Sequence, residues 1–352
     1  MPIICILFFR EKEGRGMGDK MLDLYLATLV TKDAALATQR AARSDLRLFC
    51  TWWEAKQQRS FDLGSVVDRD LREWKLTRQK GNGAAPATIN RGLSTLRRFF
   101  SWAIEQKILT ENPTKGIEDI PSTPLSPRSL PDQAVDALLR SARSGHDTRL
   151  RLRDEALLAL LIYVGLRIQE ACDVQVRDVD TASGTLIVRS GKGGKARRLP
   201  LHPDAQCIIE HYLHEVRCPA GMPAIGSDQE REAFLVGMQI TRAGQPLVPG
   251  IKTRVARQRI ADLGKVAATQ LHEAAERERT LERAEQLRMM AGQLEEVAPH
   301  MLRHSLARRL LKNGAQLPEV QRVLGHTRLS TTGIYLTPSE DDLRTALGRA
   351  GL

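Results

Sequence analysis

The sequence predicts a mainly α-helical protein of two domains with one small β-hairpin or sheet. Its 352 residues exceed what one hydrophobic core usually organises, and a hydrophobic content of 42% is enough to fill two cores. Helical periodicity runs through both halves, whereas a strand–turn–strand pattern occurs in one region. A proline-rich segment separates the halves. We therefore expect a helical first domain and a mixed α/β second domain.

Residues 1–18 are predicted to be a disordered N-terminal extension. The apolar run at 2–9 is too short to span a bilayer, and no basic residue precedes it, so it is a poor signal peptide. Met17 and Met21 both precede the first helical pattern. Either one is a candidate for the natural start.

Residues 19–118 are predicted to form the helical domain, with room for four or five helices. Apolar residues recur at helical spacing between Met21 and Leu26, between Leu46 and Trp53, from 66 to 74 and from 89 to 104. Pro86 suits the first turn of a helix, and Asn112-Pro113 ends the last helical pattern.

Residues 119–130 are predicted to be the interdomain linker. Four prolines occur in the twelve residues from Ile120 to Pro131, which disfavours both a helix and a central strand. Two domains on a short extended tether can close around a duplex. We therefore expect a C-shaped clamp, with the second domain occupying 131–352.

The second domain is predicted to begin with a helix over 131–141 and a strongly apolar helix over 153–173, with Arg167 just past its most apolar part. Segments 184–189 and 196–201 flank a glycine-rich turn, which indicates a β-hairpin with Lys192 at its tip. Residues from about 250 to 297 are charged with one apolar stripe, so they form either a long surface helix or a helical hairpin.

The net charge of +11 favours nucleic acid as the partner, because cations that neutralise phosphates release condensed counterions. Two predicted helices carry arginines at helical spacing, while their Trp and Phe residues imply that the opposite faces are buried. The alternative is an ordinary solvated face. The candidate DNA-binding residues are Arg40, Arg43, Arg91, Arg97 and Arg98.

Five cysteines without any Cys-x-x-Cys pair suggest reduced thiols in a cytoplasmic protein rather than a zinc or redox centre. His300 and His304 are spaced for one helix face, but no glutamate follows and no third ligand is near, so we predict no metal. The turn around Lys192 lacks the spacing of a phosphate loop.

A set of cations, imidazoles and one tyrosine provides the groups needed to break a phosphodiester without metal. Two guanidinium groups can bind a phosphate and offset its growing charge, a lysine can protonate the leaving 5′ oxygen, and an imidazole can accept the tyrosine proton. We assign the base to His300 and the acid to Lys192. The candidate catalytic residues are Arg167, Lys192, His300, Arg303, His326 and Tyr335.

These residues carry a resemblance to the tyrosine recombinase family, the phage integrase and Xer-type enzymes. The sequence from His300 to Ala307 and from Leu324 to Tyr335 is its most diagnostic part, and the Gly-Lys-Gly turn is less specific. Two features depart from the family pattern: Gln169 and Ala171 lie around the first arginine, and 250–297 resembles a helical insertion.

The resemblance implies a SAM-like core-binding domain followed by a recombinase catalytic domain. It also implies a 3′-phosphotyrosyl intermediate on Tyr335, a Holliday junction, no cofactor, and Glu170 as a supporting acid. The expected partners are double-stranded recombination sites, further copies of the chain in a tetramer on synapsed DNA, with a monomer or dimer in free solution, and a possible accessory protein. A nucleoid-associated location in the cytoplasm follows.

Two other functions fit parts of the pattern. The first is a catalytically silent DNA-binding regulator on the same fold, although a binder has no need of the tyrosine nucleophile. The second is a type IB topoisomerase, which the order of a helical domain first and a tail after Tyr335 disfavours. The sequence leaves open the target site and the choice among integration, transposon resolution and replicon dimer resolution.

Overall fold

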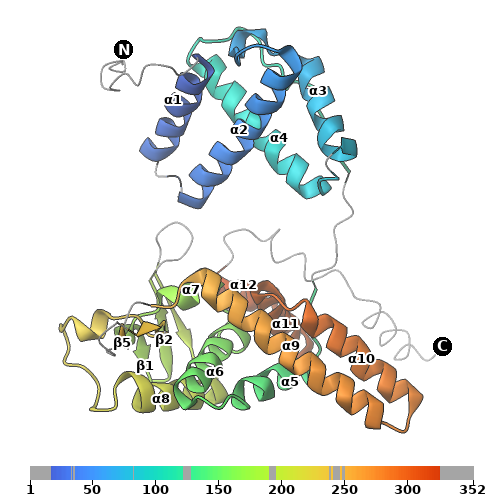
Figure 1. Ribbon diagram of the computed structural model, residues 1–352. Helices are drawn as coiled ribbons and strands as arrows, with labels where there is room; N and C mark the ends of the chain where they lie inside the picture. The colour runs from blue at the N-terminus through green and yellow to red at the C-terminus, as the bar shows by residue number, and fades with distance from the viewer. Residues whose placement is uncertain are drawn as a thin grey trace. The chain divides into compact units, whose positions relative to one another are not determined.

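The structure is a computed structural model that describes residues 17–325, apart from gaps at 33, 35, 82, 122–127, 190–195, 238, 241–245 and 248–249 (Figure 1). The chain divides into two compact units, Met1–Pro124 and Leu125–Leu352. Three of the candidate catalytic residues, Lys192, His326 and Tyr335, lie outside the described residues.

The described part of the first unit is helical, with a core rich in aromatic side chains. Phe49 and Trp53 from the second helix pack edge-on against Phe61, and Phe49 also contacts Trp74 and Phe100. Interlocking large rings fill the space between crossing helices with few residues. The helices are α1 (Met17–Thr31), α2 (Leu36–Gln57), α3 (Asp68–Leu76) and α4 (Pro86–Glu105).

Both ends of the predicted linker pack into a core. Ile120 is buried in the first unit, and Asn90 exchanges two hydrogen bonds with its backbone, at 2.8 and 2.9 Å. Leu130 is buried in the second unit, and its backbone N–H donates to Ser305 Oγ at 2.8 Å. Core contacts therefore enter the predicted linker, 119–130, from both of its ends.

The second unit begins with α5 (Asp132–Arg143), and its next helix corrects the prediction for 153–173. α6 (Thr148–Ile162) starts earlier, because Asp147 caps it by accepting from the backbone N–H groups of Arg149 and Leu150. It ends before Gly165, whose φ of 72° lies in the left-handed region. A separate short helix, α7 (Ile168–Asp173), follows. The apolar sequence is continuous from 153 to 173, but the helix is interrupted between Ile162 and Ile168.

The predicted hairpin is confirmed as part of a three-stranded antiparallel sheet of order β1-β2-β3. β2 (Thr185–Val188) pairs with β3 (Arg197–Pro200), with Val188 opposite Arg197. The two-residue β1 (Val179–Asp180) was not predicted, since it is too short to show alternation. α8 (Pro203–Tyr212) follows the sheet, and a second small sheet pairs β4 (Gln239–Ile240) with β5 (Pro246–Leu247).

Residues 250–297 contain a helical hairpin, one of the two forms left open by the sequence. α9 (Thr253–Arg277) and α10 (Leu281–Glu295) lie side by side (Figure 1). Ile260 and Leu294, one from each helix, are buried in the same core as α5 and α6. This hairpin is thus an integral layer of the second unit.

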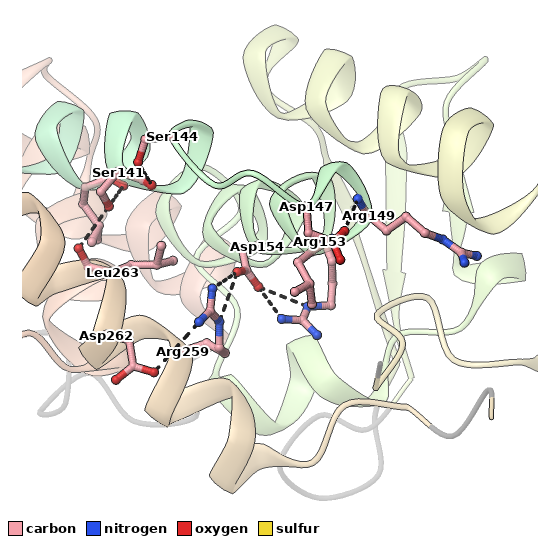
Figure 2. A network of polar contacts seen from close by, with 11 residues as sticks. Ser141, Ser144, Asp147, Arg149, Arg153, Asp154, Arg259, Asp262 and Leu263 are labelled. Carbon is pink, nitrogen blue, oxygen red and sulfur yellow. Dashed lines mark hydrogen bonds and ion pairs between the residues drawn. The ribbon is translucent and has the colours of Figure 1, made fainter. Parts of the chain in front are cut away.

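A buried charge cluster fixes α9 to α6 (Figure 2). Asp154 is 1% exposed, and its two oxygens accept from Arg153 Nη2 at 2.7 Å and from Arg259 Nη2 at 2.6 Å. Ser141 on α5 donates to the Leu263 carbonyl oxygen at 3.0 Å. Because paired and hydrogen-bonded charges are the form in which burial is tolerated, the cluster sets the position of α9 along α6.

The described chain ends with α11 (Pro299–Lys312) and α12 (Leu317–Leu324), which pack through a small apolar cluster that includes Leu306 and Leu324. None of the described helices has both the length and the apolar composition needed to cross a membrane.

Candidate active site

Arg167 lies at the N-terminus of α7, where the chain leaves the Gly165 turn. Its backbone N–H and its Nη1 both donate to Glu170, each at 2.9 Å, and its Nη2 donates to the Gly325 carbonyl oxygen at 3.2 Å. The side chain remains 32% exposed. Arg167 is therefore held from two sides while part of its side chain faces solvent.

Arg303 comes from α11, and its guanidinium contacts the backbone on both sides of the Arg167 position. It is 3% exposed, and its guanidinium donates to the carbonyl oxygens of Gly165 and Leu324. A Cβ atom on Gly165 would lie 2.7 Å from Leu306 Cδ2 on α11, so only glycine allows this close approach. Arg303 joins the turn before Arg167 to the end of α12.

Glu170 is the buried carboxylate that organises these cations. Besides Arg167, it accepts from Arg197 Nη1 at 3.1 Å and from Arg197 Nη2 at 2.9 Å. Burial acts to raise its pKa, but hydrogen bonds from Arg197 and the Arg167 backbone, with both positive charges, leave the pKa below the ordinary value. Glu170 is therefore ionised at neutral pH. Arg197 was missed by the sequence analysis, which had assigned it only to a strand.

Gly325 ends α12 in the left-handed conformation, with φ at 62° and ψ at 45°. A Cβ atom there would lie 2.9 Å from Arg197 Cζ, so the guanidinium of Arg197 lies against this residue. Glycine thus meets two requirements at once, a positive φ and space for an arginine.

His300 is exposed at the start of α11, one turn before Arg303. Partial burial lowers its pKa, and the positive charges of Arg303, Arg257 and Arg167 lower it further. The imidazole is therefore neutral at pH 7 and able to accept a proton. His304, on the next turn, has its pKa lowered to about 4 by burial and by His300 and Arg303.

Arg257 is a second cation that the sequence analysis missed. It is exposed on the second turn of α9, and its charge acts on both His300 and Cys172 of α7. Nearby, Thr253 donates to Gln169 Oε1 at 2.8 Å, which ties the start of α9 to α7. In sequence Arg257 is one of many charged residues in a helical stretch, so only the fold distinguishes it.

Three predicted catalytic residues, Arg167, His300 and Arg303, are thus brought together from α7 and α11. Lys192 belongs to the turn between β2 and β3, and His326 directly follows Gly325, but both lie outside the described residues, as does Tyr335. Within the described ranges no cluster of three or more His, Cys, Asp or Glu side chains is placed to hold a metal ion.

The arginines predicted to bind DNA lie on α2 and α4 of the first unit. Arg40 and Arg43 are exposed on α2, on the side of the helix away from its buried residues, and Arg43 lies 3.9 Å from Asp23. Arg91 on α4 pairs with the buried Asp45 of α2 at 2.7 Å and stays 52% exposed. These arginines have positive charge available to solvent.

The other two arginines of α4, Arg97 and Arg98, differ in their contacts. Arg98 is exposed seven residues after Arg91, and it donates only to the carbonyl of Ser94 in its own helix among the contacts of the described chain. Arg97 points elsewhere: it donates to Asp119 at 2.8 Å and to the Ile117 carbonyl oxygen at 2.6 Å. Arg97 therefore anchors the segment that leaves the first unit.

Comparisons with known proteins agree with this two-unit arrangement. Residues 128–341 match the family described as Phage integrase family, and residues 22–107 match the Phage integrase, N-terminal SAM-like domain. The chain is 32% identical to tyrosine recombinase XerC of Mycobacterium sp. (strain KMS) over 323 residues, 89% of this chain and 91% of the relative. It is 30% identical to tyrosine recombinase XerD of Lacticaseibacillus casei over 319 residues, 89% and 92% of the two chains.

Solved structures share the fold at low sequence identity. XerH site-specific recombinase bound to a palindromic difH substrate matches with a TM-score of 0.62 and 19% identity, covering 93% of this chain and 83% of the other. The Tn1549 transposon integrase in complex with circular intermediate DNA gives a TM-score of 0.60 and 18% identity, with 93% and 98% coverage.

A helical unit followed by a mixed unit with clustered arginines defines the class of protein, an enzyme of DNA strand exchange. The chain belongs to the phage integrase family, the tyrosine site-specific recombinases. The resemblance stated from sequence is confirmed, and the topoisomerase alternative is set aside.

Proposed function

We propose that this protein cleaves and rejoins DNA strands through a covalent bond between Tyr335 and a 3′ phosphate, with Arg167 and Arg303 binding the scissile phosphate. The observation that carries the proposal is the arginine pair, held by Glu170 and by the carbonyls of Gly165, Leu324 and Gly325. Fixed guanidinium donors stabilise the charge that develops on the non-bridging oxygens without reorganising during the reaction.

The reaction is balanced by two proton transfers. Tyr335 Oη forms a bond to phosphorus and loses its proton to His300, while the bond from phosphorus to the 5′ oxygen breaks and that oxygen takes a proton from Lys192. His326 hydrogen-bonds the phosphate. Attack by the free 5′ hydroxyl of a second duplex reverses these transfers and joins the strands, passing through a Holliday junction.

The lowered pKa of His300 supports its role as the base, because a neutral imidazole is the form that accepts a proton. The adjacent cations also favour an anion at this place, as a phosphate requires. No metal is needed in this scheme, since two arginines carry the electrostatic stabilisation.

The proposed partners are double-stranded recombination sites and other copies of the chain. The first unit binds DNA through Arg40, Arg43, Arg91 and Arg98, whereas Arg97 holds Asp119 and the Ile117 carbonyl. Four protomers act on two synapsed duplexes. We further propose that the exposed faces of α9 and α10 are where an accessory protein would bind. The protein is proposed to act in the cytoplasm, in association with the nucleoid.

The proposal is tested by trapping the covalent intermediate. Purified protein is incubated with nicked duplexes tiled from the DNA flanking its own gene, and the wild type is compared with Tyr335→Phe. A protease-sensitive adduct formed only by the wild type supports Tyr335 as nucleophile. A wild type that shifts a specific duplex without forming an adduct would instead indicate a catalytically silent DNA-binding regulator.

A further inference from the structure

We propose that Arg197 is a positioning residue for the active site, acting through Glu170 on Arg167 and through its contact with Gly325 on the end of α12. The inference rests on the proposed function of Arg167 and deepens it. Arg197 is the first residue of β3, five positions after Lys192, and is no part of the catalytic set assigned above.

The first step is the shared carboxylate. Glu170 is 5% exposed, and each of its oxygens accepts from Arg197, Oε1 at 3.1 Å and Oε2 at 2.9 Å. The same two oxygens receive Nη1 and the backbone N–H of Arg167. Because one buried carboxylate bridges two guanidinium groups, moving Arg197 changes where Glu170 lies and therefore where Arg167 points.

The second step is the contact with Gly325. The Cζ, Nε and Nη1 atoms of Arg197 all lie within 3.1 Å of the place where a Cβ on Gly325 would be. The Gly325 carbonyl in turn accepts from Arg167 at 3.2 Å. Arg197, Glu170, Arg167 and Gly325 thus close a ring of contacts that joins β3, α7 and the end of α12.

The third step is the burial of Arg197. Its side chain is only 17% exposed, and its Nε is buried with no hydrogen-bond partner among the described residues. Both Nη groups donate to Glu170, so the guanidinium of Arg197 holds in place the carboxylate that also binds Arg167.

The consequence is mechanical coupling between three parts of the site. β3 begins at Arg197 and is continuous with the turn that carries Lys192, α7 carries Arg167, and Gly325 precedes His326. A single side chain therefore holds together the start of β3, the phosphate-binding arginine before α7 and Gly325 at the end of α12. Misplacement of reacting groups by about 1 Å can cost on the order of 100-fold in rate.

A double-mutant cycle tests this coupling. The rate of adduct formation is measured with the nicked duplex that gives most adduct with the wild type, for Arg197→Ala, Arg167→Lys and the double variant. DNA affinity and the thermal midpoint are measured alongside. Arg197→Ala is expected to lower the rate about 10- to 100-fold while DNA affinity stays within about threefold. In the Arg167→Lys background, Arg197→Ala is expected to lower the rate of adduct formation less than about threefold, because the guanidinium that Arg197 positions is already absent.

The matched control is Arg198→Ala. Arg198 follows Arg197 in β3, points to the other face of the strand, and binds Thr185 Oγ1 at 2.9 Å with its side chain 62% exposed. Arg198→Ala removes one positive charge from the same strand and is expected to leave the rate of adduct formation unchanged. If Arg197→Ala lowers stability too far to study, Arg197→Lys and Glu170→Gln enter the same cycle.

Each outcome has one meaning. If Arg197→Ala lowers the rate of adduct formation by the same factor in the wild-type and Arg167→Lys backgrounds, Arg197 acts independently of Arg167. If Arg198→Ala lowers the rate as much as Arg197→Ala does, the effect comes from lost charge alone. Either result overturns the inference. A wild-type rate in Arg197→Ala also overturns it while Tyr335-dependent adducts persist. Absence of any adduct in the wild type overturns the proposed function itself, and this inference with it.

Discussion

At the scale of single residues, His300 has a lowered pKa, caused first by partial burial and then by the positive charges of Arg303, Arg257 and Arg167. As the proposed base, it must be neutral to act. We therefore expect the acid limb of the rate of adduct formation to fall at a pH below the ordinary histidine value of 6.5. A rate profile measured between pH 4 and 8 would show it.

Arg257 provides the test of the cause. Replacing it by Gln removes a positive charge that opposes protonation, so the pKa of His300 rises and the acid limb moves toward higher pH. Arg254→Gln removes an exposed arginine one turn earlier in the same helix and should move the limb less. Identical shifts from the two variants would contradict a specific electrostatic effect of Arg257 on His300.

Gly325 supports a second prediction at this scale. Gly325→Ala forces a residue with a Cβ into a left-handed backbone and against Arg197, so the free energy of unfolding should fall by about 1–3 kcal/mol. Adduct formation should fall as well, because Arg197 is displaced. Thermal unfolding and the trapping assay measure the two effects.

The matched variant is Gly314→Ala. Gly314 has a φ of 89°, but a Cβ there would meet no described atom within 4 Å. It is expected to lower stability through backbone strain alone and to leave adduct formation intact. Loss of activity in both variants would mean that the Arg197 contact is not what matters.

Sequence reasoning reached Arg167, His300 and Arg303 because short motifs surround them, and the structure brings these three together. Arg197 and Arg257 carry no such motif. Arg197 binds Glu170, 27 positions earlier in the chain, and the charge of Arg257 reaches His300 because α9 packs against α7. Their roles depend on tertiary contacts, which periodicity and composition do not encode.

At the scale of elements, the α9–α10 hairpin depends on a close approach at Gly264. A Cβ on Gly264 would lie 2.3 Å from Val297 Cγ1 and 2.4 Å from the Leu294 carbonyl oxygen. Gly264→Ala should therefore push the end of α10 away and lower the free energy of unfolding by about 1–3 kcal/mol. Chemical denaturation would measure the loss.

Gly292→Ala in α10 is the control, since a Cβ there would meet no described atom within 4 Å. Alanine favours helix over glycine by about 0.5–1 kcal/mol, so this variant should be neutral or slightly stabilised. The same Gly-to-Ala change is thus expected to have opposite signs in two helices of one hairpin. Destabilisation of equal size in both would rule out close packing as the reason.

The elements also show where a sequence pattern stops being informative. The helical hairpin and the β2–β3 pair follow from periodicity and turn residues. The division of 153–173 into α6 and α7 does not, because Leu, Ile and Val continue on both sides of Gly165 and only the tertiary contact with Leu306 requires the break. Because apolar residues are buried both in the helices and in the turn between them, the sequence pattern does not change at the turn.

At the scale of the whole molecule, the arginines of the first unit can be ranked by their contacts. Arg40→Ala and Arg43→Ala should each weaken binding to all DNA sequences and reduce the slope of log affinity against log salt by about 1. Arg97→Ala should act mainly on stability, because its donors are used on Asp119 and Ile117. Binding curves at several salt concentrations, with thermal midpoints, distinguish these outcomes.

A change of salt slope in Arg97→Ala as large as that in Arg40→Ala, at unchanged stability, would return Arg97 to the DNA-binding surface. If none of the three variants alters the slope, the contact lies elsewhere on the first unit. The sequence could group these arginines by spacing, but it could not show which ones already have partners.

The burial of Ile120 and Leu130 in separate cores has a consequence for avidity. Only a short stretch of chain joins the two units, so once one unit has bound DNA, the other faces the same duplex at an effective concentration on the order of millimolar. The affinity of the linked pair for DNA then far exceeds that of either unit alone. Cutting the chain between these two residues should leave both cores intact and yet reduce the affinity for DNA on the order of 100-fold or more.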